Sequence, residues 1–459
     1  MNHFMRSYFL ILILFAGIFG CTQTEPTDTV EINDSDVPDS TTSAPQDTQK
    51  PNLDEIPSEL IRPTDLKYLG AFRLPDASGG SSWEYSGYAA TYYPEGDPEG
   101  SDQYPGSIFA VGHDHHQQVS EISIPTPVIS SNIEDLNTAT TIQEFSDITG
   151  NMFGELEIPR AGLAYLPAQE NQNNGKLYFS WGQHYEDSAN PSFGWSELDI
   201  SSPETAGPWH LGSFSTYTTN DYMFDIPENW AAENTPGLRL ATGRFRDGLW
   251  SGRGPALYAY GPYNEGNPPA AGSTLEMVTP LLLYGEQIGT DLYIQSDESM
   301  AMDYFAESDE WSGGSWLTTE EKSAVIILGT RGVGNTWYGF SNGVVYPVDG
   351  TGDEVYPDVP DWPHDARGWW SDDIEAQILF YDPADLAKVA KGEMKTYEPQ
   401  PYAIMDLNEY LYDPGYDYER GKMYSLGAAT FDRDNGLLYI FERLADEDEK
   451  SIVHVWEVD

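Results

Sequence analysis

Residues 67–75 read KYLGAFRLP, a short apolar stretch that ends at a proline. Apolar and aromatic residues bounded in this way favour a β-strand. The stretch precedes a series of similar strand groups and belongs to none of them. The fold therefore depends on which strand of the chain pairs with residues 67–75.

A loose unit of four strands recurs after residue 61, where the chain shows almost no helical periodicity. The first unit reads GYAATYYP, SIFAVGH, VSEISIP and TIQEFSDI, and the next three units begin at AGLAYLP, YMFDIP and GGSWLTT. Gly, Pro, Asn and Asp clusters separate these short apolar segments, which indicates an all-β protein. The fifth unit holds three strands, LGAATFD, LLYIFERL and IVHVWEV, and then the chain ends.

The strand missing from the fifth unit is available at residues 67–75. Pairing this stretch beside the C-terminal strand closes a ring and removes an exposed sheet edge. Such closure resembles that of β-propellers. We therefore predict a five-bladed β-propeller over residues 61–459. Six or seven blades, or a pair of β-sandwiches, are the alternatives.

Arginines and aromatic residues concentrate in the loops that the propeller brings to one face. Strands alternate in direction within a blade, so loops before first strands and after second strands share a face. These loops hold seven arginines: Arg160, Arg244, Arg246, Arg253, Arg331, Arg420 and Arg443. Arginine suits bidentate capture of carboxylate or sulfate groups, and flat rings suit stacking on sugars. The predicted substrate-binding residues are Arg160, Arg244, Arg246, Arg253, Arg331, Trp83, Trp337 and Tyr338. Alternatively, each arginine pairs with a neighbouring Asp or Glu.

The segment GHDHHQQ, residues 112–118, contains His113, His115 and His116. Three uses of these histidines are open. In the first, His113 and His115 bind a metal such as Zn²⁺, and His184 or an acid completes the coordination shell. In the second, one histidine acts as a general acid or base. In the third, the histidines only line a pocket or a loop. His184 and Tyr185 occupy the equivalent loop of the next blade and are expected to face the first group. The catalytic candidates are therefore His113, His115, His184 and Tyr185.

This set resembles the propeller-type polysaccharide lyases in architecture and residue types only. The resemblance implies that Arg244, Arg246 or Arg253 neutralises a uronate carboxylate and stabilises the charge that develops on it. It also implies that His113, His115 or His184 removes the adjacent proton, and that Tyr185 protonates the leaving oxygen. One alternative is a glycoside hydrolase using a pair of carboxylates drawn from Glu84, Glu155, Glu157, Asp221 and Asp303. Another is a propeller that binds a glycan or a protein without cleaving it.

The N-terminus reads MNHFMRSYFLILILFAGIFGC, with a basic residue, an apolar run and a cysteine, as in secretory signals. Its last residues, IFGC, resemble the lipobox of bacterial lipoproteins, which implies that Cys21 is lipidated; an ordinary signal peptide is the alternative. Cys21 is the only cysteine, so the chain forms no internal disulfide. Residues 22–60 are rich in Thr, Asp, Ser and Pro, and we interpret them as a flexible tether. We expect a protein anchored by lipid to a bacterial membrane, by preference the outer membrane, facing the periplasm or the cell surface.

The formal net charge of −53 argues against nucleic acid as a partner, because phosphate contacts need clustered Lys and Arg. DGTGDE (349–354) and DEDE (446–449) suggest Ca²⁺, but neither has the spacing of a calcium loop, and solvated surface acid is the preferred interpretation. The sequence assigns no specific cofactor, and Ca²⁺ and Zn²⁺ are the candidate metals. We expect a monomer whose partner is an acidic polysaccharide. We expect it to contact the membrane through the lipid anchor alone.

Overall fold

The computed structural model describes residues 56–97, 104–156, 159–169, 172–185, 188–245, 249–261, 268–347, 355–419 and 422–459. These residues belong to one compact unit that spans Lys50–Asp459. Several residues named above lie outside the described ranges: Cys21, Glu157, Arg246, Arg420 and the segment 349–354. Among the residues described, no helix is long and apolar enough to cross a membrane.

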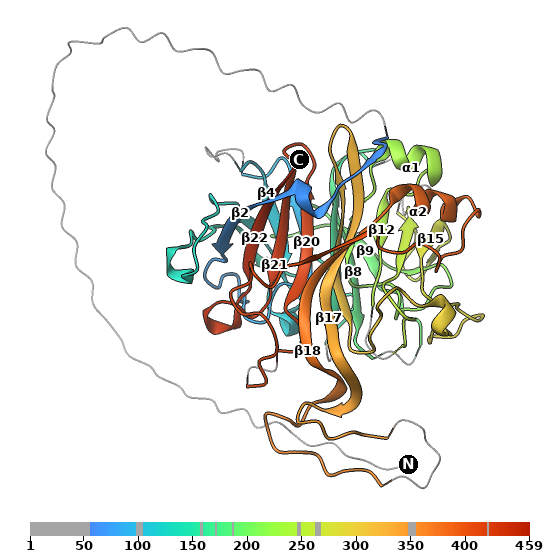
Figure 1. Cartoon of the computed structure of the whole chain (residues 1–459). Helices are drawn as coiled ribbons and strands as arrows, with labels where there is room; N and C mark the ends of the chain where they lie inside the picture. Colours follow the sequence, from blue (N-terminus) through green and yellow to red (C-terminus); the bar gives the residue numbers. More distant parts are fainter. Residues whose placement is uncertain are drawn as a thin grey trace, which may run out of the picture. The chain divides into compact units, whose positions relative to one another are not determined.

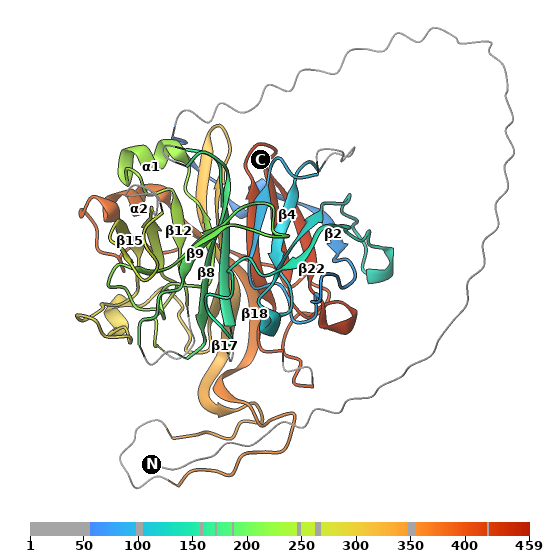
Figure 2. The same cartoon turned by 180° about the vertical axis from the view of Figure 1, so that it is seen from behind.

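The described strands form five β-sheets, which are the blades of a β-propeller (Figures 1 and 2). Blade 1 contains β3 (Ala90–Tyr93), β4 (Ser107–Val111), β5 (Val119–Ser123) and β6 (Thr141–Ser146). Blade 2 contains β7 (Pro159–Leu166), β8 (Lys176–Gln183), β9 (Phe193–Ser196), β10 (Thr205–Leu211) and β14 (Thr274–Leu275). Blade 3 contains β11 (Met223–Asp225), β12 (Leu240–Thr242), β13 (Leu257–Tyr260) and β15 (Val278–Leu282).

Blades 4 and 5 complete the set and involve both ends of the described chain. Blade 4 contains β16 (Glu310–Thr318), β17 (Lys322–Phe340), β18 (Arg367–Tyr381), β19 (Ala403–Asp406) and, parallel to the start of β17, β1 (Glu59–Leu60). Blade 5 contains β20 (Leu426–Asp432), β21 (Leu437–Glu442), β22 (Ile452–Val458) and β2 (Leu66–Arg73). The predicted all-β fold with five blades is confirmed.

Short helices connect these strands. The described α-helices are α1 (Glu228–Asn234) and α2 (Pro383–Ala390), and the described 3-10 helices are η1 (Pro63–Asp65), η2 (Asp114–His116), η3 (Ile133–Asp135), η4 (Glu298–Met300) and η5 (Glu447–Glu449). Helix α2 begins where the Asp382 carboxylate accepts a hydrogen bond from the Ala384 amide, with Pro383 in its first turn. Helix α1 packs through Trp230, whose ring centroid lies 4.6 Å from that of Trp316 in blade 4.

Strand β2 closes the ring as the fourth strand of blade 5, as residues 67–75 predict. It pairs antiparallel with β22, which places Lys67 opposite Glu457 and Phe72 opposite Val453. The inner strands β3, β7, β11, β16 and β20 contact one another in turn, and β20 contacts β3. At that last contact the Ala428 amide donates to the Gly87 carbonyl at 2.7 Å. A Cβ atom at Gly427 would lie 1.9 Å from the same oxygen, so only glycine allows this approach.

Each main hydrophobic cluster fills the space between two neighbouring blades. In β4, Ile108 and Ala110 face blade 5, whereas Phe109 and Val111 face blade 2. Successive residues of a strand point to opposite sheet faces, and here both faces are buried. This explains why strands such as β4 and β21 read as continuous apolar runs without a polar side.

The inner strands begin at one mouth of the propeller axis and end at the other. We name the mouth at the starts of the inner strands the entry face and the mouth at their ends the exit face. The hairpin of β17 and β18 extends beyond the other strands on the entry side, with pairing that continues to Phe340 and Arg367 (Figure 1).

A covalent link between β2 and β22 should stabilise the propeller. In a Cys21→Ser background, the Lys67→Cys/Glu457→Cys pair should form a disulfide, because these residues are directly opposed. Such a link constrains the unfolded chain over a very long loop. We expect the oxidised protein to unfold several degrees above its reduced form, as measured by circular dichroism. Thiols that stay free in the folded protein would contradict this closure, and Lys67→Cys alone is the control.

Candidate functional site

An ion pair between Arg160 and Glu310 lies at the entry mouth of the axis. Arg160 belongs to β7 and Glu310 begins β16, and their Nη2 and Oε1 atoms are 3.2 Å apart. Both residues are buried, with 6% and 2% of their surfaces exposed. Burial alone would lower the pKa of Arg160, but Tyr88, Glu310 and Asp221 more than offset it and raise this pKa above its ordinary value. Arg160 is therefore a fixed cation between blades 2 and 4.

Tyr88 holds a second guanidinium group at the same mouth. The Cζ atom of Arg160 lies 4.8 Å from the centroid of the Tyr88 ring, and that of Arg443 lies 3.8 Å from it. Arg443 follows β21 and is 6% exposed, yet it forms no ion pair with any carboxylate in the described part of the chain. Its Nε atom is buried and has no hydrogen-bond partner among those residues. Arg443 thus has unused donors beside a tyrosine.

Arg331 and Arg253 share this property. Arg331 lies over the ring of Tyr304 at 5.4 Å and Arg253 over that of Phe305 at 5.8 Å. Within the described ranges, the Nε atom of each is buried without a hydrogen-bond partner. Buried polar groups in proteins are nearly always hydrogen-bonded. Three of the predicted arginines of the entry face therefore have donor capacity that the described chain does not fill.

Arg244 has a different environment. Fully buried, it places Nε 3.6 Å from Asp221 Oδ1. Its Nη1 donates to the Thr216 carbonyl at 3.0 Å and its Nη2 to the His184 carbonyl at 3.2 Å. The side chain therefore fixes the backbone of two loops that lead to the mouth. This arrangement matches the alternative in which an arginine pairs with a neighbouring acid.

Asp309, directly before Glu310, is a fully buried carboxyl group beneath Arg331. Burial raises its pKa to about 7, although the amides of Ala306 and Gly332 and the charge of Arg331 act in the opposite direction. Glu307 adds to the increase. A carboxyl group with this pKa exchanges its proton near neutral pH, which is a property of many catalytic acids and bases.

The histidines of GHDHHQQ form a compact turn around η2. The rings of His113 and His116 stack with centroids 4.3 Å apart, and His116 Nδ1 lies 2.9 Å from the Ser81 hydroxyl. The His115 side chain is 58% exposed. Burial lowers the pKa of His113 below its ordinary value, and Asp114 only partly opposes this. His113 is therefore neutral at neutral pH and able to accept a proton.

This turn lies close to the arginines of the entry mouth. Strand β7, which carries Arg160, contacts η2. The Val111 amide donates to the Ala89 carbonyl at 3.0 Å, so His113 follows β4 just beyond the level of Tyr88. His184 and Tyr185 form a separate aromatic group with Trp250, in which the Tyr185 and Trp250 centroids are 5.4 Å apart.

The predicted aromatic residues divide between the core and the hairpin. Trp83 is 1% exposed and packs on Phe145 with centroids 4.6 Å apart, so its ring is enclosed in the core. Trp337 and Tyr338 lie on the projecting part of β17. The Trp337 indole donates to the Phe340 carbonyl, and Tyr338 contacts Trp369 and Arg367.

The acidic candidates are dispersed. Among the described residues, no group of three or more His, Cys, Asp and Glu side chains could hold a metal ion. In the DEDE tract, Asp446 and Glu447 pair with Arg73 at 2.8 and 2.7 Å. Glu84 forms a β-bridge with Lys450, and the Asp303 amide donates to Gln400. Of the carboxylates considered for a hydrolase, Asp221 lies at the entry mouth.

Sequence reasoning did not select Tyr88, Asp309 or Glu310. All three lie at or just before the start of an inner strand. Polar residues at the starts of these strands are the sequence feature that could have identified them. The sequence prediction rested on arginine, histidine and aromatic residues of the loops, whereas these three residues lie at the strand starts that meet on the axis.

Comparisons with known proteins provide little further guidance. No protein family and no curated protein matches this chain. A solved structure of a glucose dehydrogenase aligns over 85% of this chain and 98% of its own, with 10% sequence identity and a TM-score of 0.24. That similarity is too low to support an argument about function.

Asp309 should make the folded state less stable as the pH rises from about 4 to about 7. Over this range the folded protein holds a proton that the unfolded chain has released, so a higher pH favours unfolding. Relative to Asp309→Asn, the wild type should lose at most about 4 kcal/mol of unfolding free energy across this window. Urea unfolding at a series of pH values measures the difference.

The control for this prediction is Asp199→Asn. Hydrogen bonds from Ser201 lower the pKa of Asp199, so this variant should differ from the wild type in pH dependence only below about 4. Parallel wild-type and Asp309→Asn curves between about pH 4 and 7 would show that Asp309 is ionised throughout.

Proposed function

We propose that the entry face binds an acidic polysaccharide and cleaves it by β-elimination. The observation that carries this proposal is Arg443, a buried guanidinium without a carboxylate partner among the described residues, in a protein with 75 acidic residues. A buried charge is costly unless it is paired and hydrogen-bonded. Where carboxylates of the chain are abundant, a buried arginine left unpaired supports a role in binding a carboxylate from outside.

The geometry supports a division of roles among the arginines. Arg160 and Arg244 are committed to Glu310 and Asp221, so they maintain the frame of the mouth. Arg253, Arg331 and Arg443 have unfilled donors and are the proposed ligands of uronate or sulfate groups. The ring of Tyr88 packs against the guanidinium group of Arg443, whose Cζ atom lies over that ring. The half-buried ring of Tyr338 and the exposed ring of Trp362, which lies between β17 and β18, extend the surface along which a chain of sugars would lie.

The proposed elimination uses one base and one acid. Arg443 binds the uronate carboxylate and stabilises the charge that develops when the adjacent C–H bond is broken. His113 takes that proton, because its neutral form is favoured and the turn carrying it lies beside β7. The electrons of the C–H bond form a carbon–carbon double bond as the neighbouring glycosidic bond breaks. A tyrosine hydroxyl, of Tyr185 or Tyr88, protonates the departing oxygen.

His115 and His184 remain alternative bases, and the alanine variants of the three histidines distinguish among them. His115 is the most exposed of the three, and the His184 carbonyl is held by Arg244. Membrane attachment through Cys21 and an outer-membrane location remain part of the proposal, supported by the N-terminal sequence alone.

The test is the ultraviolet absorbance of the unsaturated uronate produced from a panel of uronic acid polysaccharides. Wild type should generate this absorbance, and His113→Ala should abolish it. Arg443→Lys should reduce kcat/KM by about 10²-fold, because lysine keeps the charge but loses the planar pair of donors. Arg62→Lys is the matched control, since Arg62 also lies over a tyrosine, Tyr402, at 5.3 Å.

Other outcomes identify the alternatives. New reducing ends without absorbance would replace elimination with hydrolysis. Retention on an immobilised acidic glycan without any cleavage would leave a binding protein. Activity that persists in His113→Ala but disappears in His115→Ala or His184→Ala would move the base to that residue.

The pH dependence of cleavage provides an independent check on His113. Because its pKa is lowered by burial, kcat/KM should rise with pH through a value below 6.5 and remain level above it. A rise centred above 6.5 would contradict His113 as the base. Tyr88→Phe and Tyr185→Phe then distinguish the proton donor, because the variant that lacks it should lose kcat with little change in KM.

A further inference from the structure

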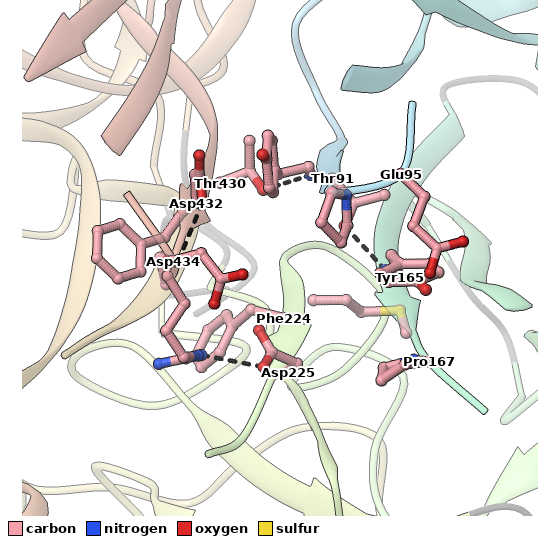
Figure 3. A pocket seen from close by; sticks show the side chains of 15 residues that line it. Thr91, Glu95, Tyr165, Pro167, Phe224, Asp225, Thr430, Asp432 and Asp434 are labelled. Atoms are coloured by element: carbon pink, nitrogen blue, oxygen red, sulfur yellow. Dashed lines mark hydrogen bonds and ion pairs between the residues drawn. The ribbon is translucent and has the colours of Figure 1, made fainter. Parts of the chain in front are cut away.

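A cavity of about 240 Å³ opens at the exit face, on the side of the axis away from the arginines. The ends of all five inner strands line it, so every blade contributes to its wall. The histidine and arginine loops of the entry face take no part in it. We name it the exit cavity, and Figure 3 shows the residues that line it.

The rim of the exit cavity is acidic. Glu95, Asp225 and Asp434 surround the open space in Figure 3, and Asp432 lies deeper in the wall. The cationic residue of the lining is Arg433, whose Nη2 is 3.0 Å from Asp225 Oδ2. Its Nη1 donates to the Trp316 carbonyl and the Thr318 hydroxyl. Arg433 is therefore committed to the wall, and the rim retains an excess of negative charge.

The floor of the cavity contains hydroxyl groups with unused bonding capacity. Ser315 of β16 is 3% exposed, lines the cavity, and makes no side-chain hydrogen bond to any residue of the described chain. Thr91 and Thr430 accept bonds from the amides of Tyr165 and Tyr92, at 2.8 and 2.7 Å. Their hydroxyl protons bond to no other described residue. These hydroxyl groups open into the cavity, where a bound molecule can complete their hydrogen bonds.

Aromatic side chains form the remaining wall. Phe224, Phe431 and Tyr165 line the cavity together with Met223. Aromatic faces attract organic cations, most strongly where water is excluded. Within the described ranges the acidic side chains do not gather into a group that could hold a metal ion. An organic cation, by contrast, can reach separate carboxylates and contact rings at the same time.

We propose that the exit cavity binds a small organic ammonium ion. The carboxylates of Glu95 and Asp434 balance its charge, the aromatic rings contact its alkyl groups, and the hydroxyl of Ser315 accepts or donates a hydrogen bond at the floor. The volume is below the roughly 300–1,000 Å³ of pockets for drug-sized ligands, which limits the ligand to a small molecule. This proposal is independent of the polysaccharide function at the entry face.

The test is calorimetric titration of the full-length protein with choline and with its neutral dimethylbutanol isostere, in which carbon replaces the ammonium nitrogen. Choline should bind at least about tenfold more tightly than the neutral alcohol, because only the cation interacts with both rings and carboxylates. The double variant Glu95→Gln/Asp434→Asn should weaken choline binding by about tenfold. Asp97→Asn removes one negative charge two residues from Glu95, outside the cavity lining, and should leave binding unchanged.

Two variants at the floor locate the site. Ser315→Leu should fill the cavity and abolish binding, while Ser315→Ala should weaken binding without disturbing the fold. Arg443→Lys on the entry face should have no effect, which separates this proposal from the polysaccharide function. Equal affinity for the neutral alcohol, absence of binding at about 10 mM choline, or binding that survives both Ser315 variants would each overturn the proposal.

Discussion

Burial of both faces of every sheet is the constraint on which this structure depends. Each blade lies between two others, and the apolar clusters fill the spaces between them. A single blade would expose one or both of its apolar faces to water, at about 25 cal/mol for each Å². No blade is therefore expected to be stable alone, and the ring must close for the first and last blades to be covered. With no cysteine besides Cys21, packing has to provide this stability.

This same constraint explains why the fold was predictable. Two-sided burial gives runs such as SIFAV and SAVIIL, whose length and flanking turn residues mark them as strands. The unpaired stretch at 67–75 and the incomplete last unit then determined the closure. Residues at the start of the described chain behave less regularly, because β1 pairs with β17 through only Glu59 and Leu60. A pairing this short leaves no recognisable pattern in a tract rich in polar residues.

The candidate site was less accessible to sequence reasoning, because its residues come from all five blades. Strand order places arginines on one face, yet it does not reveal which are already paired. Arg244 resembles Arg253 in the sequence, but Arg244 pairs with Asp221 and donates hydrogen bonds to two carbonyl groups, whereas the Arg253 side chain makes no ion pair or hydrogen bond with the described residues. Trp83 resembles an exposed loop tryptophan and is in fact core. The exit cavity was missed because its hydroxyl floor consists of Ser and Thr within strands, where the sequence shows only small residues.

The pairing of β2 with β22 has a consequence for the order of events during folding. Lys67 and Glu457 are 390 positions apart, so the blade that contains both strands remains incomplete until β22 has been synthesised. Until then β2 is an open edge, and the exposed charge of Lys67 discourages it from pairing with another chain. Most of the polypeptide is therefore synthesised before the ring can close. The closing contact is made by the seven residues of β22, which follow all the other described strands in the sequence.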